Sequence, residues 1–300
     1  MAYEAPRTAS RNGVSEFKLK EQMCDIGQRI WLKGFCAGNE GNHSVRIADG
    51  RFLCTPTGIS KARLKPDDIC TVDPSGKQLA GRRQRSSEFL MHAAIYKARP
   101  DVNAVVHSHP PHATAFAVAG VELPTCIHPE AEVFLGPVRT AKYVTPGDTR
   151  LGESLMPYIN ECNTILLGNH GVVCYAADLE QAYYQLEIVD AYARILLLAR
   201  QLGSVQTLSG DEMAELIRLK ARFGLSDPRA EAAAHNSVPC TLSDFMARVG
   251  GEVGTRGRMM RGDSAGPLQS PYPGRDGVGI DEAQVEQLVQ TITDQIMAAS

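Results

Sequence analysis

Three of the eight histidines of this chain lie within six positions, in the stretch VVHSHPPH at residues 105–112. In an extended strand alternate residues point to the same face, so His107 and His109 would project side by side. His112 follows two prolines and falls out of this alternation. Two imidazoles on one strand can supply half of a zinc site, which needs a further ligand and, for catalysis, an open position. A polar strand end is the simpler interpretation of the stretch taken alone.

Small polar residues elsewhere strengthen the metal interpretation. His170 lies in a glycine-flanked turn, GNHG at 168–171, where backbone can approach a ligand closely. Glu88 follows two serines at the expected start of a helix. Two further turns, GNHS at 41–44 and TPTG at 55–58, add hydroxyls, an amide and free N–H groups. Such donors can bind a phosphate monoester where no Lys/Arg cluster is available.

The composition is that of an ordinary globular chain. Of 300 residues, 43% are hydrophobic and 22% charged, and the net charge of −3 argues against a nucleic-acid partner. The eight cysteines form no CxxC pair, so we expect reduced, buried thiols of a cytoplasmic protein. The N-terminus has no apolar stretch, and no apolar run reaches 18 residues, so neither secretion nor a membrane span is expected.

Hydrophobic periodicity predicts helices and strands in alternation along the first hundred residues. A helix is expected over about 15–33, ending before Gly34. The next helix lies within 86–100, with Ser86 or Ser87 as its N-cap. Between them, three β-like runs separated by Pro, Gly and Asp predict an antiparallel meander: SVRIA (44–48), RFLCT (51–55) and ICTVD (69–73).

The same alternation continues to about residue 202. We expect a strand at 103–109, a short helix at 112–120 and two strands around a tight turn at 163–176. The longest helical pattern covers 178–202, before Gly203. Because strands and helices alternate, an α/β fold with a three-layer α/β/α architecture is predicted.

The composition changes near residue 249. Residues 249–279 contain nine glycines and three prolines with little apolar periodicity, which predicts a flexible linker. We therefore divide the chain into a flexible N-terminus (1–14), a catalytic domain (15–248), this linker (249–279) and a C-terminal amphipathic helix (280–300). One apolar stripe defines that helix: Val285, Leu288, Val289, Ile292 and Ile296.

Five ordered motifs resemble those of the class II, zinc-dependent aldolase family. They are GNHSVR, TPTGISK, SSEFLMHAAIY, AVVHSHPPHATAFA and GNHGVV. The resemblance covers about residues 15–225. The family includes L-fuculose-phosphate aldolase, which the chain resembles most, and shares its fold with the adducin head domain. The resemblance implies a class II aldolase-like domain with three α/β/α layers and a central, mainly antiparallel sheet.

The resemblance also implies roles for the singled-out residues. One zinc ion per subunit would be held by His107, His109 and His170, with Glu88 as fourth ligand in the resting enzyme and as the catalytic acid/base when substrate arrives. The implied phosphate-binding residues are Asn42, Thr57, Gly58, Ser86 and Ser87.

Two tyrosines of the fuculose-phosphate enzyme are missing here. One is replaced by Pro129, which Glu130 and Glu132 follow, and the second by Phe223. The proton donor for the C4 hydroxyl therefore has to be another group, and Glu130 or Glu132 is a candidate acid/base residue.

The implied function is a lyase that cleaves L-fuculose 1-phosphate to dihydroxyacetone phosphate and L-lactaldehyde, with L-rhamnulose 1-phosphate as a second candidate substrate. A homotetramer is implied as well. The alternatives are a sugar-phosphate 4-epimerase of the L-ribulose 5-phosphate type, a methylthioribulose-phosphate-type dehydratase and a non-catalytic adducin-like binding module. Residues 280–300 resemble the encapsulation peptides of bacterial microcompartments, so we expect them to bind shell or cargo proteins. No membrane partner is expected.

The other polar residues have simpler expected roles. His92, one helical turn after Glu88, is expected to pack in the helix, whereas His43 and His112 are expected to make hydrogen bonds or lie at the surface. Lys61 is expected to be a solvated cation, or else a neighbour of the phosphate.

Overall fold

The computed structural model describes residues 14–47, 50–250 and 252–254. The predicted flexible N-terminus, apart from Val14, and the predicted amphipathic helix 280–300 lie outside the described residues. Regular structure continues to Gly254, a few residues into the predicted linker.

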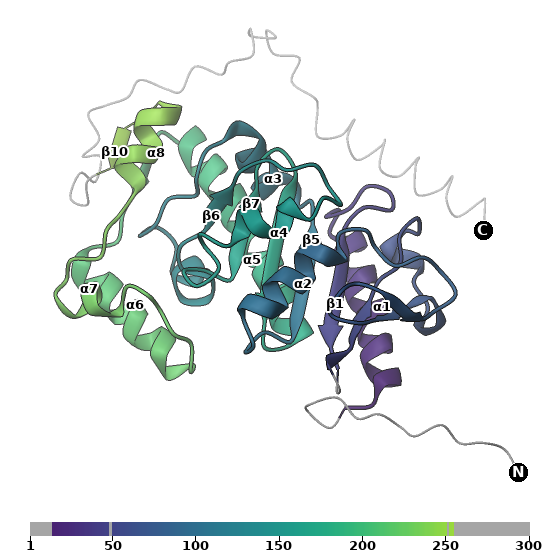
Figure 1. Cartoon of the computed structure of the whole chain (residues 1–300). Helices are drawn as coiled ribbons and strands as arrows, with labels where there is room; N and C mark the ends of the chain where they lie inside the picture. The colour runs from purple at the N-terminus through teal and green to yellow at the C-terminus, as the bar shows by residue number, and fades with distance from the viewer. Residues whose placement is uncertain (1–13, 48–49, 251, 255–300) are drawn as a thin grey trace, which may run out of the picture. The chain divides into compact units, whose positions relative to one another are not determined.

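One eight-stranded sheet forms the centre of the molecule, in the order β4-β3-β2-β1-β5-β8-β7-β6 (Figure 1). Every neighbouring pair is antiparallel except β6 and β7, so the predicted mainly antiparallel sheet is confirmed. The strands are β1 (Asn42–Arg46), β2 (Phe52–Cys54), β3 (Cys70–Val72), β4 (Gln78–Ala80), β5 (Ala104–Ser108), β6 (Arg139–Ala141), β7 (Thr164–Leu167) and β8 (Gly171–Ala176).

Helices cover both faces of this sheet. Val106 of β5 belongs to a core with α1 (Glu16–Leu32), α3 (Pro111–Ala119) and α5 (Leu179–Gln201). Its neighbour Val105 points to the opposite face, into a second core with α2 (Phe89–Ala98) and α4 (Arg150–Leu155). Both faces of the central strands are buried, and the predicted three-layer α/β/α architecture is confirmed.

The N-terminal half of the sheet is the predicted meander. β1 pairs with β2 through Ser44 and Cys54, and β2 pairs with β3 through Phe52 and Val72. Two short 3₁₀ helices, η2 (Lys61–Arg63) and η3 (Pro66–Asp68), connect β2 to β3. β1 then pairs with the distant β5, and this places residues 42–45 beside 104–107.

The long helices begin and end where the sequence predicts. The Ser15 side chain accepts a hydrogen bond from the Lys18 amide (3.3 Å) at the start of α1, and Gly34 follows that helix in the left-handed region. The Asp178 side chain accepts from the Gln181 amide (2.8 Å) at the start of α5.

The predicted N-cap of α2 is wrong. Neither Ser86 nor Ser87 caps the helix, because Glu88 occupies the N-cap position. The Ser86 amide donates instead to Thr55 O (3.1 Å), and Ser86 Oγ accepts from the Glu88 amide (3.3 Å). Ser86 therefore ends an extended segment, and the turn that follows brings the Glu88 carboxylate to the helix start.

A C-terminal layer follows α5. It contains α6 (Gly210–Arg222), α7 (Ala230–Ala234), α8 (Leu242–Val249) and a small parallel sheet of β9 (Ser204–Gln206) and β10 (Glu252–Gly254). A separate small core joins Met213 and Ile217 of α6 to Cys126. The π-helix η4 (Ala131–Leu135) packs against both α5 and α6.

The expectation of eight reduced cysteines is wrong for two of them. Cys126 and Cys240 form a disulfide, with Cα atoms 5.4 Å apart across 114 residues of sequence. Thr125 and Thr241 hydrogen-bond each other's segments beside it, so tertiary packing brings the thiols together. No spacing pattern in the sequence reveals such a pair. The other six cysteines are free.

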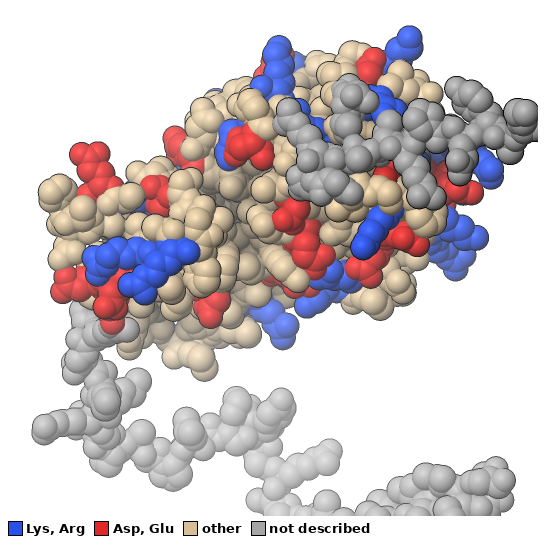
Figure 2. Space-filling model, turned by 90° about the horizontal axis from the view of Figure 1, so that it is seen from below, with Lys and Arg blue, Asp and Glu red and all other residues tan. Residues whose placement is uncertain are grey.

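Two properties of the described part bear on its partners. Its helices include none that is both long and apolar enough to span a bilayer. On the face seen in Figure 2, basic and acidic side chains are interspersed, without a broad basic region.

Candidate metal centre

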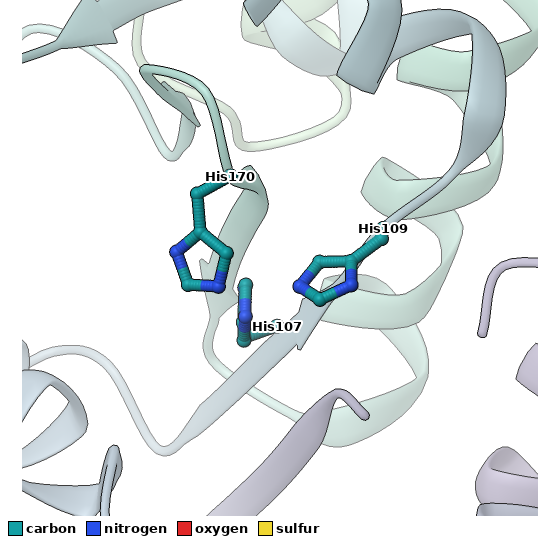
Figure 3. A group of neighbouring side chains, drawn as sticks. All are labelled: His107, His109 and His170. Carbon is teal, nitrogen blue, oxygen red and sulfur yellow. The ribbon is translucent and has the colours of Figure 1, made fainter. Parts of the chain in front are cut away.

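Three imidazoles meet at one end of the central strands. His107 lies on β5, His109 just beyond it, and His170 in the turn between β7 and β8 (Figure 3). Their ring centroids are 4.7–5.0 Å apart. One nitrogen of each ring can be chosen so that all three atoms lie within 4.8 Å of one another. The antiparallel pairing of β5 with β8 produces this convergence, because Ser108 is opposite Val172.

The turn that carries His170 depends on its neighbours. Asn169 adopts a left-handed conformation (φ 54°), which Asn tolerates better than most residues. A Cβ at Gly171 would collide with the His109 ring and lie 2.7 Å from Ser108 O. Only glycine at position 171 allows the turn to lie this close to the end of β5, and so His170 reaches the other two histidines.

The hydrogen bonds of the rings leave nitrogens free for a ligand. His107 Nδ1 is 2.8 Å from Val172 O and therefore carries the proton, which leaves a lone pair on Nε2. His109 Nδ1 lies 3.5 Å from a Glu40 carboxylate oxygen. Nε2 of both rings is buried and has no hydrogen-bond partner. Buried polar atoms are rarely left unsatisfied, so this arrangement fits metal-ligating histidines held through their other nitrogen.

Glu88 lies across the opening between these rings. Its carboxylate oxygens are 3.5 Å from His107 Nε2 and 3.6 Å from His170 Nε2. Asn42 Nδ2 donates to one of them (2.7 Å), while the other, Oε1, is buried without a partner. Three nitrogens and a carboxylate make a donor set that suits Zn²⁺.

Burial sets the charge of the rings. It lowers the pKa of His107 well below 6.5, and the neighbouring His109 and His170 lower it further. Burial also lowers the pKa of His170, against the opposing effect of Glu88. Neutral imidazole is the form that binds a metal, so these two rings are ready to bind at neutral pH.

Four of the five predicted phosphate-binding residues lie on two segments that pair with each other. The Thr57 amide donates to Gln84 O (2.9 Å), and the Ser86 amide donates to Thr55 O (3.1 Å). Thr57, Gly58 and Ser87 are exposed, whereas Ser86 is buried. The fifth residue, Asn42, is buried on β1 and contacts Glu88.

The two candidate acid/base glutamates have other partners. Glu130 is exposed, and its carboxylate lies 3.3 Å from His128 Nε2. Glu132 is buried on η4, pairs with Arg229 (2.7 Å) and accepts a hydrogen bond from the Cys126 amide. Phe223, at the end of α6, packs its exposed ring near that of Phe134.

His43 and His112 make hydrogen bonds, as expected. His43 Nε2 is 2.8 Å from Met23 O, and His92, which is buried in α2, has its Nδ1 2.7 Å from Ser44 Oγ. His112 is held by Asp190 of α5 (2.9 Å), which also accepts the amides at the start of α3.

Two further residues lie near the site. Glu40 was not among the predicted site residues, but it contacts His109, and its position directly before the GNHS motif was the available signal. Lys61 is only 1% exposed, so the expectation of a solvated cation is wrong. Nothing in its sequence neighbourhood reveals the burial, which depends on the packing of η2 against α1.

Comparison with known proteins places this geometry in a family. The family described as "Class II Aldolase and Adducin N-terminal domain" matches residues 21–197. Among curated relatives, L-fuculose phosphate aldolase of Escherichia coli is 33% identical over 209 residues, covering 69% of this chain and 96% of the relative. The 5-deoxy-D-ribulose 1-phosphate aldolase of Bacillus thuringiensis is 31% identical, covering 69% and 97%. The 3-oxo-tetronate 4-phosphate decarboxylase of Pectobacterium atrosepticum is 31% identical, covering 67% and 94%.

A solved structure agrees with these relatives. An L-fuculose 1-phosphate aldolase superposes with a TM-score of 0.64 at 29% identity, covering 74% of this chain and all of the other. The chain belongs to the class II aldolase and adducin family and is an enzyme of the class II aldolase superfamily. Its relatives at similar identity differ in substrate and reaction, so family membership leaves the choice between aldol cleavage and decarboxylation to the site.

Proposed function

We propose that this protein is a zinc-dependent aldolase that cleaves L-fuculose 1-phosphate to dihydroxyacetone phosphate and L-lactaldehyde, with L-rhamnulose 1-phosphate as a second substrate. The observation that carries the proposal is the convergence of three imidazoles with the Glu88 carboxylate beside them. The relatives named as L-fuculose phosphate aldolases support the choice of substrate.

His107, His109 and His170 would hold the zinc ion, with Glu88 as the fourth ligand before substrate binds. When bound, zinc supplies a Lewis acid that polarises the substrate carbonyl and stabilises negative charge on its oxygen. The unpartnered Nε2 atoms of His107 and His109 fit this role, and so does the neutral state that burial favours.

Glu88 is suited to move the proton at C3. In cleavage, the C4 hydroxyl loses a proton, the C3–C4 bond breaks, and Glu88 protonates C3 of the three-carbon product. The hydrogen bond from Asn42 holds one Glu88 oxygen, and the other has no partner and is free to act. Of the two candidates for the proton acceptor at the C4 hydroxyl, exposed Glu130 fits better, because Glu132 is buried in an ion pair with Arg229.

The exposed hydroxyls and amides of Thr57, Gly58 and Ser87, with buried Ser86 and Asn42, would bind the phosphate. Their two segments are fixed by mutual backbone hydrogen bonds, so little ordering is needed on binding. Unphosphorylated L-fuculose should therefore be a poor substrate.

The test is an assay of purified protein with candidate ketose 1-phosphates, measuring dihydroxyacetone phosphate. Glu88→Gln should keep its zinc but lose turnover by about 100-fold or more, while the exposed control Glu153→Gln should behave as wild type. Turnover of wild-type magnitude in Glu88→Gln would contradict the assigned role.

Decarboxylation is the second candidate reaction, because a relative of nearly equal identity is named a 3-oxo-tetronate 4-phosphate decarboxylase. Release of CO₂ from that substrate, without triose phosphate from L-fuculose 1-phosphate, would select it. Epimerised L-ribulose 5-phosphate would select the 4-epimerase, and loss of water from methylthioribulose 1-phosphate the dehydratase. A wholly inactive protein that still binds a partner would select the adducin-like module.

We also propose a homotetramer. Support comes from α5, which exposes apolar side chains at a helical spacing: Tyr184, Ile195 and Leu198, continued by the C-cap residue Leu202. A mass measurement by light scattering tests this proposal, and Leu198→Glu should shift the protein toward smaller species. A monomeric wild-type protein would contradict it.

Finally, we propose that residues 280–300 direct the enzyme into a bacterial microcompartment by binding shell or cargo proteins. The sequence pattern supports this, since a single apolar stripe follows a Gly/Pro-rich linker. A fluorescent protein fused to residues 249–300 should form puncta in a host that makes the shell. Leu288→Asp with Ile292→Asp should disperse them, whereas Gln290→Asp with Thr293→Asp, on the polar face, should not. Diffuse fluorescence from the intact fusion would contradict the proposal.

A further inference from the structure

A buried ammonium group lies next to the loop that carries Thr57 and Gly58 of the candidate phosphate site. Lys61, the first residue of η2, is 1% exposed. Its Nζ donates to Asn39 O (2.7 Å) and to Ile59 O (3.1 Å). Among the residues that the structure describes, no carboxylate lies within ion-pair distance of this Nζ. Lys61 is thus a buried cation that contacts two neutral carbonyls.

Such an arrangement is unfavourable unless a counter-ion arrives. A buried charge is normally paired, because removing an ammonium group from water is strongly unfavourable. Burial lowers the pKa of Lys61 accordingly, and this effect outweighs the opposing electrostatic effects of Cys36, Cys54, Glu40 and Glu88. Both of these glutamates already contact the histidines of the candidate metal centre. Neither carboxylate is within ion-pair distance of the Lys61 ammonium.

The two carbonyls that Lys61 binds belong to the segments that carry the predicted phosphate ligands. Ile59 follows Thr57 and Gly58, and Asn39 lies three residues before Asn42. The Lys61 ammonium group therefore links the segment that leads to Asn42 to the loop that carries Thr57 and Gly58.

The backbone of Lys61 is held in place by its packing against α1. A Cβ at Gly27 of α1 would lie 2.7 Å from Lys61 O, so the backbone of η2 rests directly on this glycine. Lys61 is consequently a rigid cation beside an exposed, polar loop, which is the arrangement that a dianion would complete.

We propose that Lys61 is the counter-ion of the phosphate dianion of the substrate, acting through the field of its buried ammonium and by holding the backbone of residues 39 and 59. It is a positioning residue, since Nζ contacts the loops and not the reacting atoms. The proposal rests on the phosphorylated substrate of the proposed function, but the phosphate affinity can be measured without turnover.

The experiment is a calorimetric titration of the metal-loaded protein with inorganic phosphate. Lys61→Gln keeps an N–H donor but removes the charge, and should weaken phosphate binding about 10- to 100-fold, as expected for loss of a charge-assisted interaction. Lys61→Arg keeps the charge and should bind within about threefold of wild type. Lys77→Gln, an exposed lysine, is the matched control and should bind as wild type.

A second measurement uses wild-type protein alone, in case Lys61→Gln does not fold. The buried ammonium should exchange its protons slowly with water, so its nitrogen–proton signal should be observable by NMR and should shift on phosphate addition. In assays with L-fuculose 1-phosphate, Lys61→Gln should raise KM and leave kcat nearly unchanged, whereas a purely structural defect would lower the amount of active enzyme.

Equal phosphate affinities of wild type and Lys61→Gln would overturn the proposal, and so would a wild-type protein that binds no phosphate or an ammonium signal that does not move. If phosphate binding depends on Lys61 but no ketose 1-phosphate is cleaved, the proposed reaction fails and the phosphate site stands. If cleavage occurs with the same KM in Lys61→Gln, the reaction stands and this inference fails.

Discussion

Two clusters of buried polar side chains differ in how completely they are satisfied. In the C-terminal layer, Arg229 pairs with Glu132 (2.7 Å) and with Asp227 (2.9 Å), and Lys220 pairs with Asp227 (3.0 Å). All four side chains are at least nine-tenths buried. At the candidate metal centre, by contrast, Nε2 of His107 and Nε2 of His109 are buried and have no hydrogen-bond partner.

The comparison separates a structural cluster from a binding site. Burial alone would raise the pKa of Asp227, but its hydrogen bonds and charges from Arg229 and Lys220 lower it to about 2, so the pairs compensate each other internally. The histidine cluster has no internal compensation for its free nitrogens. Unsatisfied buried atoms at one end of a rigid sheet therefore indicate a ligand, whereas satisfied ones indicate architecture.

The largest expected effect, on zinc content and turnover, comes from changing the histidine cluster of the candidate metal centre. His107→Ala should remove most of the bound zinc and lower turnover by about 10⁴-fold, because it deletes one of three fixed ligands from a buried strand. The measurement is metal content by mass spectrometry together with turnover. His235→Ala, at an exposed position, is the control. Wild-type zinc content and turnover in His107→Ala would remove the basis for the metal centre.

Breaking the ion-pair cluster of Arg229, Glu132, Asp227 and Lys220 should lower the stability of the fold instead. Arg229→Met leaves two buried carboxylates without their main partner and should lower the free energy of unfolding by about 3–5 kcal/mol. Urea denaturation measures this change. Arg150→Met, which removes an exposed pair with Asp148, is the control and should leave the urea midpoint close to that of wild type. Loss of zinc from folded Arg229→Met protein would show that the two clusters are not independent.

A smaller effect is expected from the glycine that brings His170 to the site. Gly171→Ala should weaken zinc binding about 10- to 100-fold, because the added Cβ displaces His109 and the backbone of Ser108. Competition with a chelator measures the affinity. Gly38→Ala is the control, since a Cβ there meets no atom within 4 Å. Equal affinities in the two variants would mean that the turn adapts freely.

The smallest effect concerns pH. Burial lowers the pKa of His43 from 6.5 to about 4, so the unfolded chain binds a proton that the folded chain does not. The contribution of neutral His43 to the free energy of unfolding is fully present above pH 6.5 and is lost as the pH falls toward 4. Between pH 7 and pH 5 this contribution should fall by about 2 kcal/mol. His43→Leu should show a correspondingly smaller loss in urea unfolding at these two pH values. An unchanged difference would contradict the assigned ionisation.

Local signals account for the parts of the fold that the sequence predicted. Alternating apolar residues mark β5, the GNHG turn marks the β7–β8 hairpin, and Asp178 marks the start of α5. The site histidines were recognisable because their type is rare and their spacing matches one face of a strand. The motifs of the family then supplied Glu88.

Features that depend on distant contacts were not predictable. Cys126 meets Cys240 through the packing of the C-terminal layer, and Lys61 is buried where η2 packs against α1. The N-cap of α2 was placed wrongly because the Ser86 amide donates to Thr55 O in an extended segment. The sequence rules for helix starts do not take such a long-range hydrogen bond into account. In each case tertiary structure overrides a valid local preference.

The order of the strands has a consequence for synthesis. Strands β1 and β5 are synthesised before β8. In the nascent chain β5, which carries His107, can therefore pair with β1 on one edge while its other edge is still unpaired. Open edges of apolar strands invite pairing with other chains. That edge is covered only when the hairpin bearing His170 arrives, and the same event completes the histidine triad. Protection from aggregation and competence to bind a metal are therefore acquired in one step of biogenesis.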